Sequence, residues 1–236
     1  MKNLISVSLI ILSLHLFTSV PLHCQSSALV DSLHRQLRLH PQPDSVRWNL
    51  LYALARNYRQ TNPDSGIFYS SAAYELAQQL KDDVFIFNSY NVLGVSYTIR
   101  NREDQGLAWF LKALELAKSH AGDAWRKMQA QALINIAGLF YAQQQFEKAL
   151  PYAKAAESIL ILLNEPQVLA DDYQSLGLMY SNLTKLDSAL LYFSKALAIY
   201  ENLGNRQQQG RVLREIGNIQ YKQEHSRQPW TICKKP

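Results

Sequence analysis

Residues 175–180 read Ser-Leu-Gly-Leu-Met-Tyr, and residues 189–193, beginning twelve positions after that glycine, read Ala-Leu-Leu-Tyr-Phe. Each motif combines a small residue with apolar and aromatic ones. Within each, these residues recur at spacings that line one face of a helix rather than of a strand. A small residue on such a face allows two helix axes to approach closely, while large side chains fill the groove beside the contact. The stretch therefore predicts two helices packed as a hairpin.

The small residue at the centre of the first motif recurs along the chain. It is found at Ala55, Gly94, Ala137, Gly177 and Gly217, which are separated by 39, 43, 40 and 40 positions. Self-similarity at such a period is typical of repeat architectures. A single hairpin leaves an apolar face bare, so neighbouring hairpins are expected to stack and cover it. The sequence predicts an all-α fold of stacked antiparallel helix hairpins.

These motifs resemble the tetratricopeptide repeat, with Leu-Gly-x-x-Tyr in its first helix and Ala…Tyr-Phe…Ala-Leu in its second. The resemblance implies a right-handed α-solenoid of about four and a half repeats, although the period near 40 exceeds the usual 34 or so. The expected organisation is a signal peptide at 1–24, an N-terminal helix and linker at 25–43, the array at 44–224 and an irregular basic tail at 225–236. Within the array, we expect repeats at about 44–81, 82–119, 123–163 and 165–202, and a half repeat at 205–224.

Several local signals predict where helices begin. Asn62 is expected to cap a helix that starts at Pro63, and Asn101 and Thr184 are expected to act as caps in the same way. The N-terminal helix is expected to be capped by Ser26 or Ser27 and to pack on the first hairpin through one apolar face. Pro151 lies past the first turn of its helix, where a kink is expected.

The chain end departs from the repeat pattern. After Lys222 no second helix of a fifth hairpin can be recognised. We therefore expect Val212, Leu213, Ile216 and Ile219 to leave apolar surface uncovered, and self-association through this incomplete repeat is a further expectation.

The first residues predict export. Lys2 is followed by an apolar run at 4–16 and a polar exit at 18–25, the layout of a secretory signal peptide cut near Cys24. The alternative is an uncleaved membrane anchor, which needs about 20 apolar residues. Lipid attachment at Cys24 is a poor match because His23 precedes it. The expected location is periplasmic or extracellular, with no integral membrane segment in the mature chain unless the signal is retained.

No catalytic or cofactor site is predicted. The acidic pairs Asp82-Asp83 and Asp171-Asp172 are each interpreted as the start of a helix, where the dipole favours negative charge. The histidines show no metal-ligand spacing, so we predict neither a metal nor a cofactor, and no enzyme. The net charge of +5 arises from Arg206 onward, where seven basic residues accompany two acidic ones. This basic end lacks interleaved aromatic residues, so nucleic acid is not an expected partner.

The resemblance implies a concave groove lined by the first helices, which would bind a protein or peptide ligand. Amide side chains there could hydrogen-bond an extended backbone, and arginines could pair with carboxylates. The groove positions would include Asn49, Tyr52, Arg56, Asn88, Asn91, Asn135, Tyr141, Gln174, Ser181, Arg214 and Asn218.

The layout of signal peptide, short helix and repeats opening at residues 44–55 is also similar to the exported sensor halves of bacterial histidine kinases and helix-turn-helix regulators. Two functions follow. One is an exported protein–protein interaction scaffold; the other is the truncated N-terminal sensor region of such a kinase or regulator.

Overall fold

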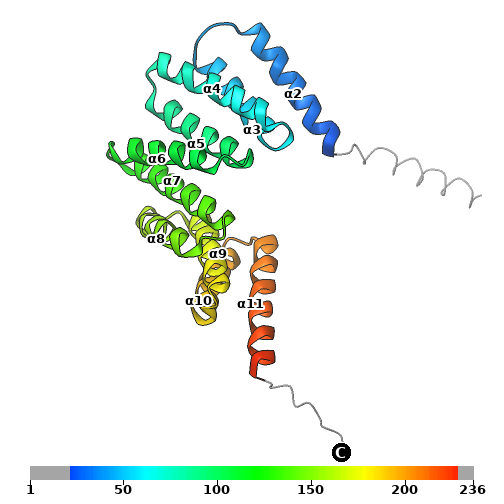
Figure 1. The fold of residues 1–236 in the computed structure, drawn as a ribbon, viewed down its shortest axis with the longest axis vertical. Coiled ribbons are helices and arrows are strands. Elements are labelled where there is room, and N and C mark those ends of the chain that lie inside the picture. Colours follow the sequence, from blue (N-terminus) through cyan, green and yellow to red (C-terminus); the bar gives the residue numbers. More distant parts are fainter. Residues whose placement is uncertain (1–21, 228–236) are drawn as a thin grey trace, which may run out of the picture. The chain divides into compact units, whose positions relative to one another are not determined.

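The computed structural model describes residues 22–227, and all of their regular secondary structure is α-helical (Figure 1). The predicted signal peptide, apart from its last three residues, and most of the predicted tail lie outside this range. The chain divides at Arg100 into two compact units, which are described separately here.

Unit 1 contains α2 (Leu22–Leu39), α3 (Ser45–Thr61), α4 (Pro63–Leu80) and α5 (Asp83–Ile99). Helix α3 packs against the other three, and α4 also packs against α5. Trp48 of α3 lies at the centre of this packing. Its ring stacks on Phe85 at 4.1 Å between centroids, and its Nε1 donates to the Ser89 hydroxyl at 3.2 Å. An aromatic side chain with a satisfied polar atom thus joins the first helices of two hairpins.

Helix α2 packs on the first hairpin, as the sequence predicts. Leu33 is buried together with Leu50 and Leu54 of α3, whereas Leu29 is half exposed. The prediction of a cap at Ser26 or Ser27 is wrong. The helix begins at Leu22 and therefore continues through both serines.

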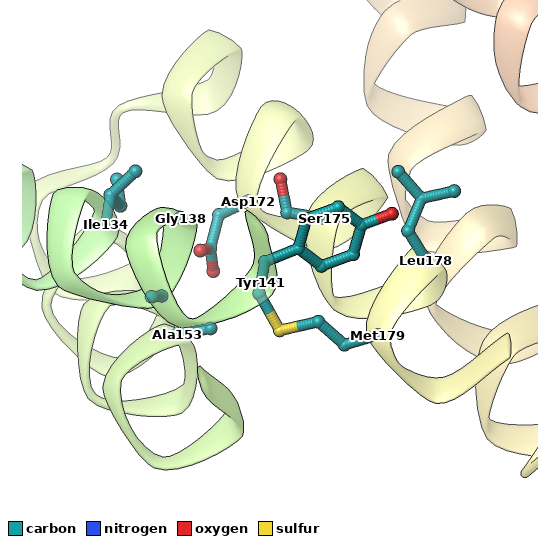
Figure 2. A pocket seen from close by; sticks show the side chains of 9 residues that line it. Ile134, Gly138, Tyr141, Ala153, Asp172, Ser175, Leu178 and Met179 are labelled. Atoms are coloured by element: carbon teal, nitrogen blue, oxygen red, sulfur yellow. The ribbon is translucent and has the colours of Figure 1, made fainter. Parts of the chain in front are cut away.

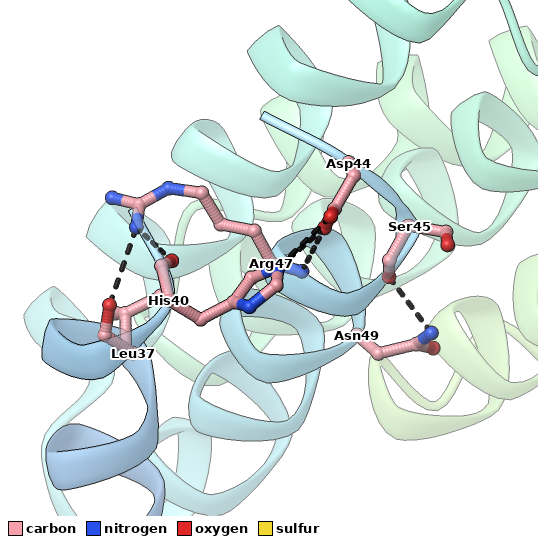
Figure 3. Close-up of polar contacts among 6 residues, drawn as sticks. All are labelled: Leu37, His40, Asp44, Ser45, Arg47 and Asn49. Atoms are coloured by element: carbon pink, nitrogen blue, oxygen red, sulfur yellow. Dashed lines mark hydrogen bonds and ion pairs between the residues drawn. The ribbon is translucent and has the colours of Figure 1, made fainter. Parts of the chain in front are cut away.

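Polar contacts fix the linker between α2 and α3 (Figure 3). The Asp44 carboxylate caps α3 by accepting from the Arg47 backbone N–H at 3.0 Å, and it also contacts the His40 ring at 2.9 Å. These two contacts, the backbone bond first, lower the pKa of Asp44. The Arg47 side chain donates to the carbonyls of Leu37 and His40, which satisfies the end of α2.

Unit 2 contains α6 (Glu103–Lys118), α7 (Asp123–Ala142), α8 (Phe146–Leu163), α9 (Pro166–Asn182), α10 (Leu186–Asn202) and α11 (Arg206–Arg227). Each helix packs against the next along the chain. Leu176, Phe193 and Tyr200 are fully buried in its core. Helix α8 runs through Pro151 without interruption.

The close helix contact predicted at Gly177 is confirmed. A Cβ atom at this position would lie 2.7 Å from the ring of Phe193, which belongs to the following helix α10. The ring therefore occupies the space that the glycine leaves free. Gly66 in unit 1 is equally constrained, because a Cβ there would lie 2.9 Å from the Cα of Arg59.

Most connections between successive helices contain one residue in the left-handed conformation. These residues are Lys81, Asn101, Gln144, Asn164, Thr184 and Gly204. After α9, for example, the N–H of Thr184 donates to Ser181 and that of Lys185 donates to Tyr180. This is the bonding pattern of a Schellman motif, which satisfies the last carbonyls of a helix.

The turn geometry corrects two predicted caps. Asn101 and Thr184 lie in the left-handed turn positions and make no side-chain cap to the following helix. Thr184 serves the end of α9 because the Schellman turn needs a left-handed residue there. The prediction for Asn62 is confirmed: it accepts from the Ser65 N–H, and α4 begins at Pro63.

Helix α11 corrects the expectation for the chain end. Val212 and Ile219 are buried against the preceding helices and Ile216 is partly buried, so only Leu213 of the four is mainly exposed. One face of α11 points to the core regardless of whether another helix follows. The helix also extends to Arg227, so residues 225–227 of the predicted irregular tail are helical.

Candidate functional site

A cavity of about 120 Å³ lies between α7 and α9 in unit 2, with Ala153 of α8 at its side (Figure 2). Its walls are mainly apolar, and its polar groups are the side chains of Tyr141, Asp172 and Ser175. In Figure 2 the Asp172 carboxylate and the Tyr141 hydroxyl point to different sides. The lining residues are Ile134, Ala137, Gly138, Tyr141, Ala153, Asp172, Ser175, Leu178 and Met179.

Asp172 corrects the interpretation of the second acidic pair. Helix α9 begins at Pro166, so Asp171 and Asp172 lie in its interior rather than at its start. Asp171 is exposed, and its carboxylate accepts from the Tyr200 hydroxyl at 2.6 Å. Asp172 is only 4% exposed, and its Oδ2 has no hydrogen-bond partner within residues 22–227. The first pair matches the prediction, because Asp82 caps α5.

Asp172 occupies a core position of the repeat. It lies five residues before the small residue of its helix, and the residues five before the other small residues are Leu50, Ser89, Ala132 and Val212. All five are buried, and Asp172 is the charged member of the set. Burying an ionised carboxylate is costly unless a partner compensates for it. The repeat geometry therefore puts a charge where the neighbouring repeats place a small or apolar side chain.

Nearby cations are engaged by another acid. The Lys154 ammonium lies 3.0 Å from Glu157 and also contacts the Tyr192 hydroxyl, and Lys195 lies 3.9 Å from Glu157. Both ammonium groups also lie over the Tyr192 ring. Glu157 is itself buried. The two lysines thus compensate mainly for Glu157.

Burial raises the pKa of Asp172 to about 7, with a further contribution from the negative charge of Glu157 and an opposing one from Lys154. The same carboxylates and burial raise the pKa of the neighbouring Tyr173 hydroxyl. Near neutral pH, Asp172 therefore exchanges between a neutral acid and a carboxylate, and a nearby cation would favour the carboxylate.

In unit 1, most predicted groove residues contact other residues of their own helix. The amides of Asn49 and Asn91 donate to backbone carbonyls four residues earlier (Figure 3 shows Asn49). Tyr52 stacks on Trp48, and Arg56 lies over the Tyr52 ring at 5.8 Å. Asn88 is half buried.

In unit 2, Tyr141 is the predicted residue that lines the cavity. Asn135 accepts from Gln131, and Gln174 accepts from the Tyr200 hydroxyl. Arg214 pairs with Glu215 at 3.2 Å; Ser181 is half buried and Asn218 exposed. The structure thus brings one predicted residue to the cavity together with Asp172, which the sequence interpretation missed. Comparing the five buried positions would have identified it.

Unit 1 contains a hollow of about 410 Å³ between α2, the linker, α3 and α4. The charged side chains that line it are Arg47 and Glu75, and the large exposed ring of Phe68 lies at the same place. Arg47 already holds the end of α2 through its bonds to the carbonyls of Leu37 and His40.

Residues 22–227 contain no group of three or more His, Cys, Asp or Glu side chains that could hold a metal ion. Among the same residues, no helix combines the length and apolar character needed to cross a bilayer.

Residues 128–202, which include the cavity, match the family model of the tetratricopeptide repeat. The matching model describes a repeat rather than an enzyme. No curated protein matches the sequence at a significant level.

Solved structures share the fold at low sequence identity. BtubC (BKLC) from P. vanneervenii has a TM-score of 0.67 and 21% identity, covering 83% of this chain and 80% of that one. A Rap protein complexed with Competence and Sporulation Factor has a TM-score of 0.61 and 15% identity, covering 86% and 73%. A signal transduction ATPase with a tetratricopeptide repeat sensor from Pyrococcus horikoshii has a TM-score of 0.63 and 16% identity, covering 72% and 26%. These likenesses establish the helical-repeat fold.

Proposed function

We propose that this protein is an exported scaffold that binds an extended peptide or protein segment across α7 and α9, with the cavity between them receiving one anchor side chain. The observation that carries this proposal is the cavity itself. It lies between the first helices of two consecutive predicted hairpins, and its apolar walls surround a buried acid. Concave sites with apolar walls and a few polar groups are typical ligand sites.

The fold comparisons support a binding role. The Rap protein was solved with Competence and Sporulation Factor bound, so a helical-repeat fold of this kind can hold a ligand. Stacked repeats present extended surfaces suited to this purpose. The match of residues 128–202 to the tetratricopeptide repeat lies over the same helices.

Panning a random peptide library against the full-length protein tests the proposal. Enriched peptides should lose binding to Gly138→Leu, because this side chain would enter the cavity, where a Cβ meets no atom within 4 Å. They should retain binding to Gly217→Leu, which makes the same change at another open glycine. A library that yields no binder, or binders unaffected by Gly138→Leu, would contradict the proposed site.

Export is the second part of the proposal, and it rests on the apolar run at 4–16 and its polar exit. Fusing residues 1–30 to a phosphatase that is active only outside the cytoplasm should give activity. N-terminal sequencing of the secreted product should start near Gln25. A fusion that remains inactive would remove the export proposal without affecting the binding proposal.

A sensor role is the second candidate function. It is favoured by the fold similarity to the Pyrococcus horikoshii protein, whose repeats are described as a sensor and of which this chain spans about a quarter. In this case the chain would be the N-terminal sensor region of a histidine kinase or helix-turn-helix regulator. Genomic sequence after codon 236, read in three frames, should then encode a membrane helix and an effector domain. Its absence in every frame would exclude this candidate.

A further inference from the structure

The cavity between α7 and α9 has the chemistry of a cation site. We propose that it binds an alkylammonium group, with the ammonium on Asp172 and the carbon chain along the apolar walls. The group is either a lysine side chain of the peptide ligand or a free small amine. This inference rests on the proposed binding function and specifies what the cavity recognises.

Asp172 is a buried acid with an unsatisfied oxygen. Asp172 is 96% buried, it lines the cavity, and its Oδ2 accepts no hydrogen bond from residues 22–227. Buried charged groups are normally paired or hydrogen-bonded. The other repeats place Leu50, Ser89, Ala132 and Val212 at the equivalent position, so packing alone does not require an acid there.

The α7 wall of the cavity is open at Gly138. A Cβ at Gly138 would meet no atom within 4 Å, although this glycine lies inside a helix, where alanine is favoured. Gly177 has a packing reason, because the Phe193 ring fills its place. Gly138 has no such neighbour and borders the cavity. Its missing side chain keeps the cavity accessible from the surface of α7.

The size of the cavity and its number of acceptors fit an alkylammonium group. A cavity of about 150 Å³ can hold benzene, so about 120 Å³ accommodates a four-carbon chain. An ammonium has three donors, whereas a guanidinium has five in a fixed plane. The acceptors available are the Asp172 carboxylate, the Tyr141 hydroxyl and the Ser175 hydroxyl, whose proton is donated to the Asp171 carbonyl. The small acceptor set fits the ammonium better, and an anionic ligand would be repelled.

The surrounding charges leave room for a cation. The charges of Glu157 and Lys154 of α8 act on Asp172, Tyr141 of α7 lines the same cavity, and the Tyr173 hydroxyl responds to the Asp172 carboxylate. Lys195 and Tyr192 of α10 contact Glu157. Lys154 and Lys195 pair with Glu157, and Asp171 pairs with Tyr200. Because burial raises the pKa of Asp172 to about 7, a bound cation should be held more tightly at pH 8 than at pH 6.

Calorimetry and fluorescence polarisation with the full-length protein test this inference. The probes are n-butylamine and an acetylated, amidated pentapeptide with a central lysine between alanines; the matched peptide has norleucine in place of lysine. We expect the lysine peptide to bind and the norleucine peptide to bind at least tenfold more weakly. The dissociation constant of the lysine peptide should rise about tenfold from pH 8 to pH 6, following the loss of the carboxylate.

Three variants distinguish the outcomes. Asp172→Asn and Gly138→Leu should each weaken binding of the lysine peptide at least tenfold. Asp187→Asn, an equal charge change at an exposed residue of α10, should not. If n-butylamine binds tightly by itself, the natural ligand is a free amine rather than a lysine side chain of a peptide. Binding of neither amine probe, or binding unchanged in Asp172→Asn, overturns the inference. If library peptides nevertheless bind and are lost in Gly138→Leu, the proposed binding function stands alone.

Discussion

Helices α9 and α11 carry the same motif in different surroundings. Gly177 and Gly217 both follow an aliphatic residue at the same position of the repeat. Gly177 is buried, with Phe193 of α10 occupying the space beside it, whereas Gly217 is exposed and a Cβ there would meet no atom within 4 Å. The need for glycine at Gly177 therefore comes from its contact with Phe193 of α10, not from the helix that contains it.

The opposite face of the two helices shows a second difference. Asp172 of α9 and Val212 of α11 hold the same position and are both buried, at 4% and 0% exposure. The side that faces the preceding helices is thus closed in both cases. An apolar residue suits this side, so the acid in α9 must lower the stability of the fold when it ionises.

The largest expected effect comes from this acid. A pKa raised from 3.8 to about 7 corresponds to about 4 kcal/mol between the two protonation states. Because the pKa is higher in the folded than in the unfolded chain, folding is penalised as Asp172 ionises. The penalty is absent below about pH 4, grows between pH 4 and 7 and is complete above pH 7. Asp172→Asn should therefore stabilise the protein at pH 8 and have little effect at pH 4.

Urea unfolding of the wild type and of Asp172→Asn at several pH values measures how the difference in their stability varies with pH. Asp187→Asn serves as the control, because this carboxylate is exposed on α10. A difference between wild type and Asp172→Asn that does not vary with pH would show that Asp172 is not the titrating group.

The next largest effect is expected at the hairpin contact. Gly177→Leu should destabilise the protein by about 3 kcal/mol, since the added side chain must displace the fully buried Phe193 ring. Gly217→Leu should not lower stability and should raise it by about 0.5–1 kcal/mol, because Leu forms helices better than Gly and this position is open. Thermal melts of the pair measure the contrast. Equal melting temperatures would contradict the α9–α10 contact.

The fold could be predicted from the sequence because the helices of each hairpin are neighbours in the sequence and the same contacts recur from one repeat to the next. The Gly177 motif and the Ala189 motif sit a fixed distance apart, and helix periodicity alone then indicates which faces meet. Helix caps were predicted less well. The sequence interpretation assigned Thr184 to the start of α10, yet the residue adopts the left-handed conformation that ends α9. Threonine is uncommon in that conformation, so its type gives no indication of it.

The site was predicted only in part. Tyr141 was expected near a ligand and does line the cavity. Asp172 was missed because two successive acids are typical of a helix start, whereas Pro166, the actual start, lies six residues earlier. The information was present in the repeat register, which aligns Asp172 with Val212. The cavity itself depends on the spacing of α7 and α9 and cannot be read from either helix alone.

A smaller effect should separate two neighbouring residues of α11. Val212 is fully buried and Leu213 is 53% exposed. Val212→Ala should lower stability by about 2 kcal/mol, the value of a buried valine side chain. Leu213→Ala should lower it by no more than about 0.5 kcal/mol. If α11 detached from α10 in solution, urea unfolding would show the two changes to be equally mild.

The smallest effect is expected at Gly217, where a Cβ would meet no neighbouring atom. Gly217→Ala should stabilise the protein by about 0.5–1 kcal/mol, because alanine loses less backbone entropy in a helix and meets no neighbouring atom. The same change at Gly177 should destabilise, since its Cβ would lie 2.7 Å from the Phe193 ring. Denaturant midpoints that shift in opposite directions for the two alanine variants would establish that contact with Phe193, rather than helix propensity, determines the need for glycine at Gly177. A gain at both positions would mean that the Phe193 ring can move aside.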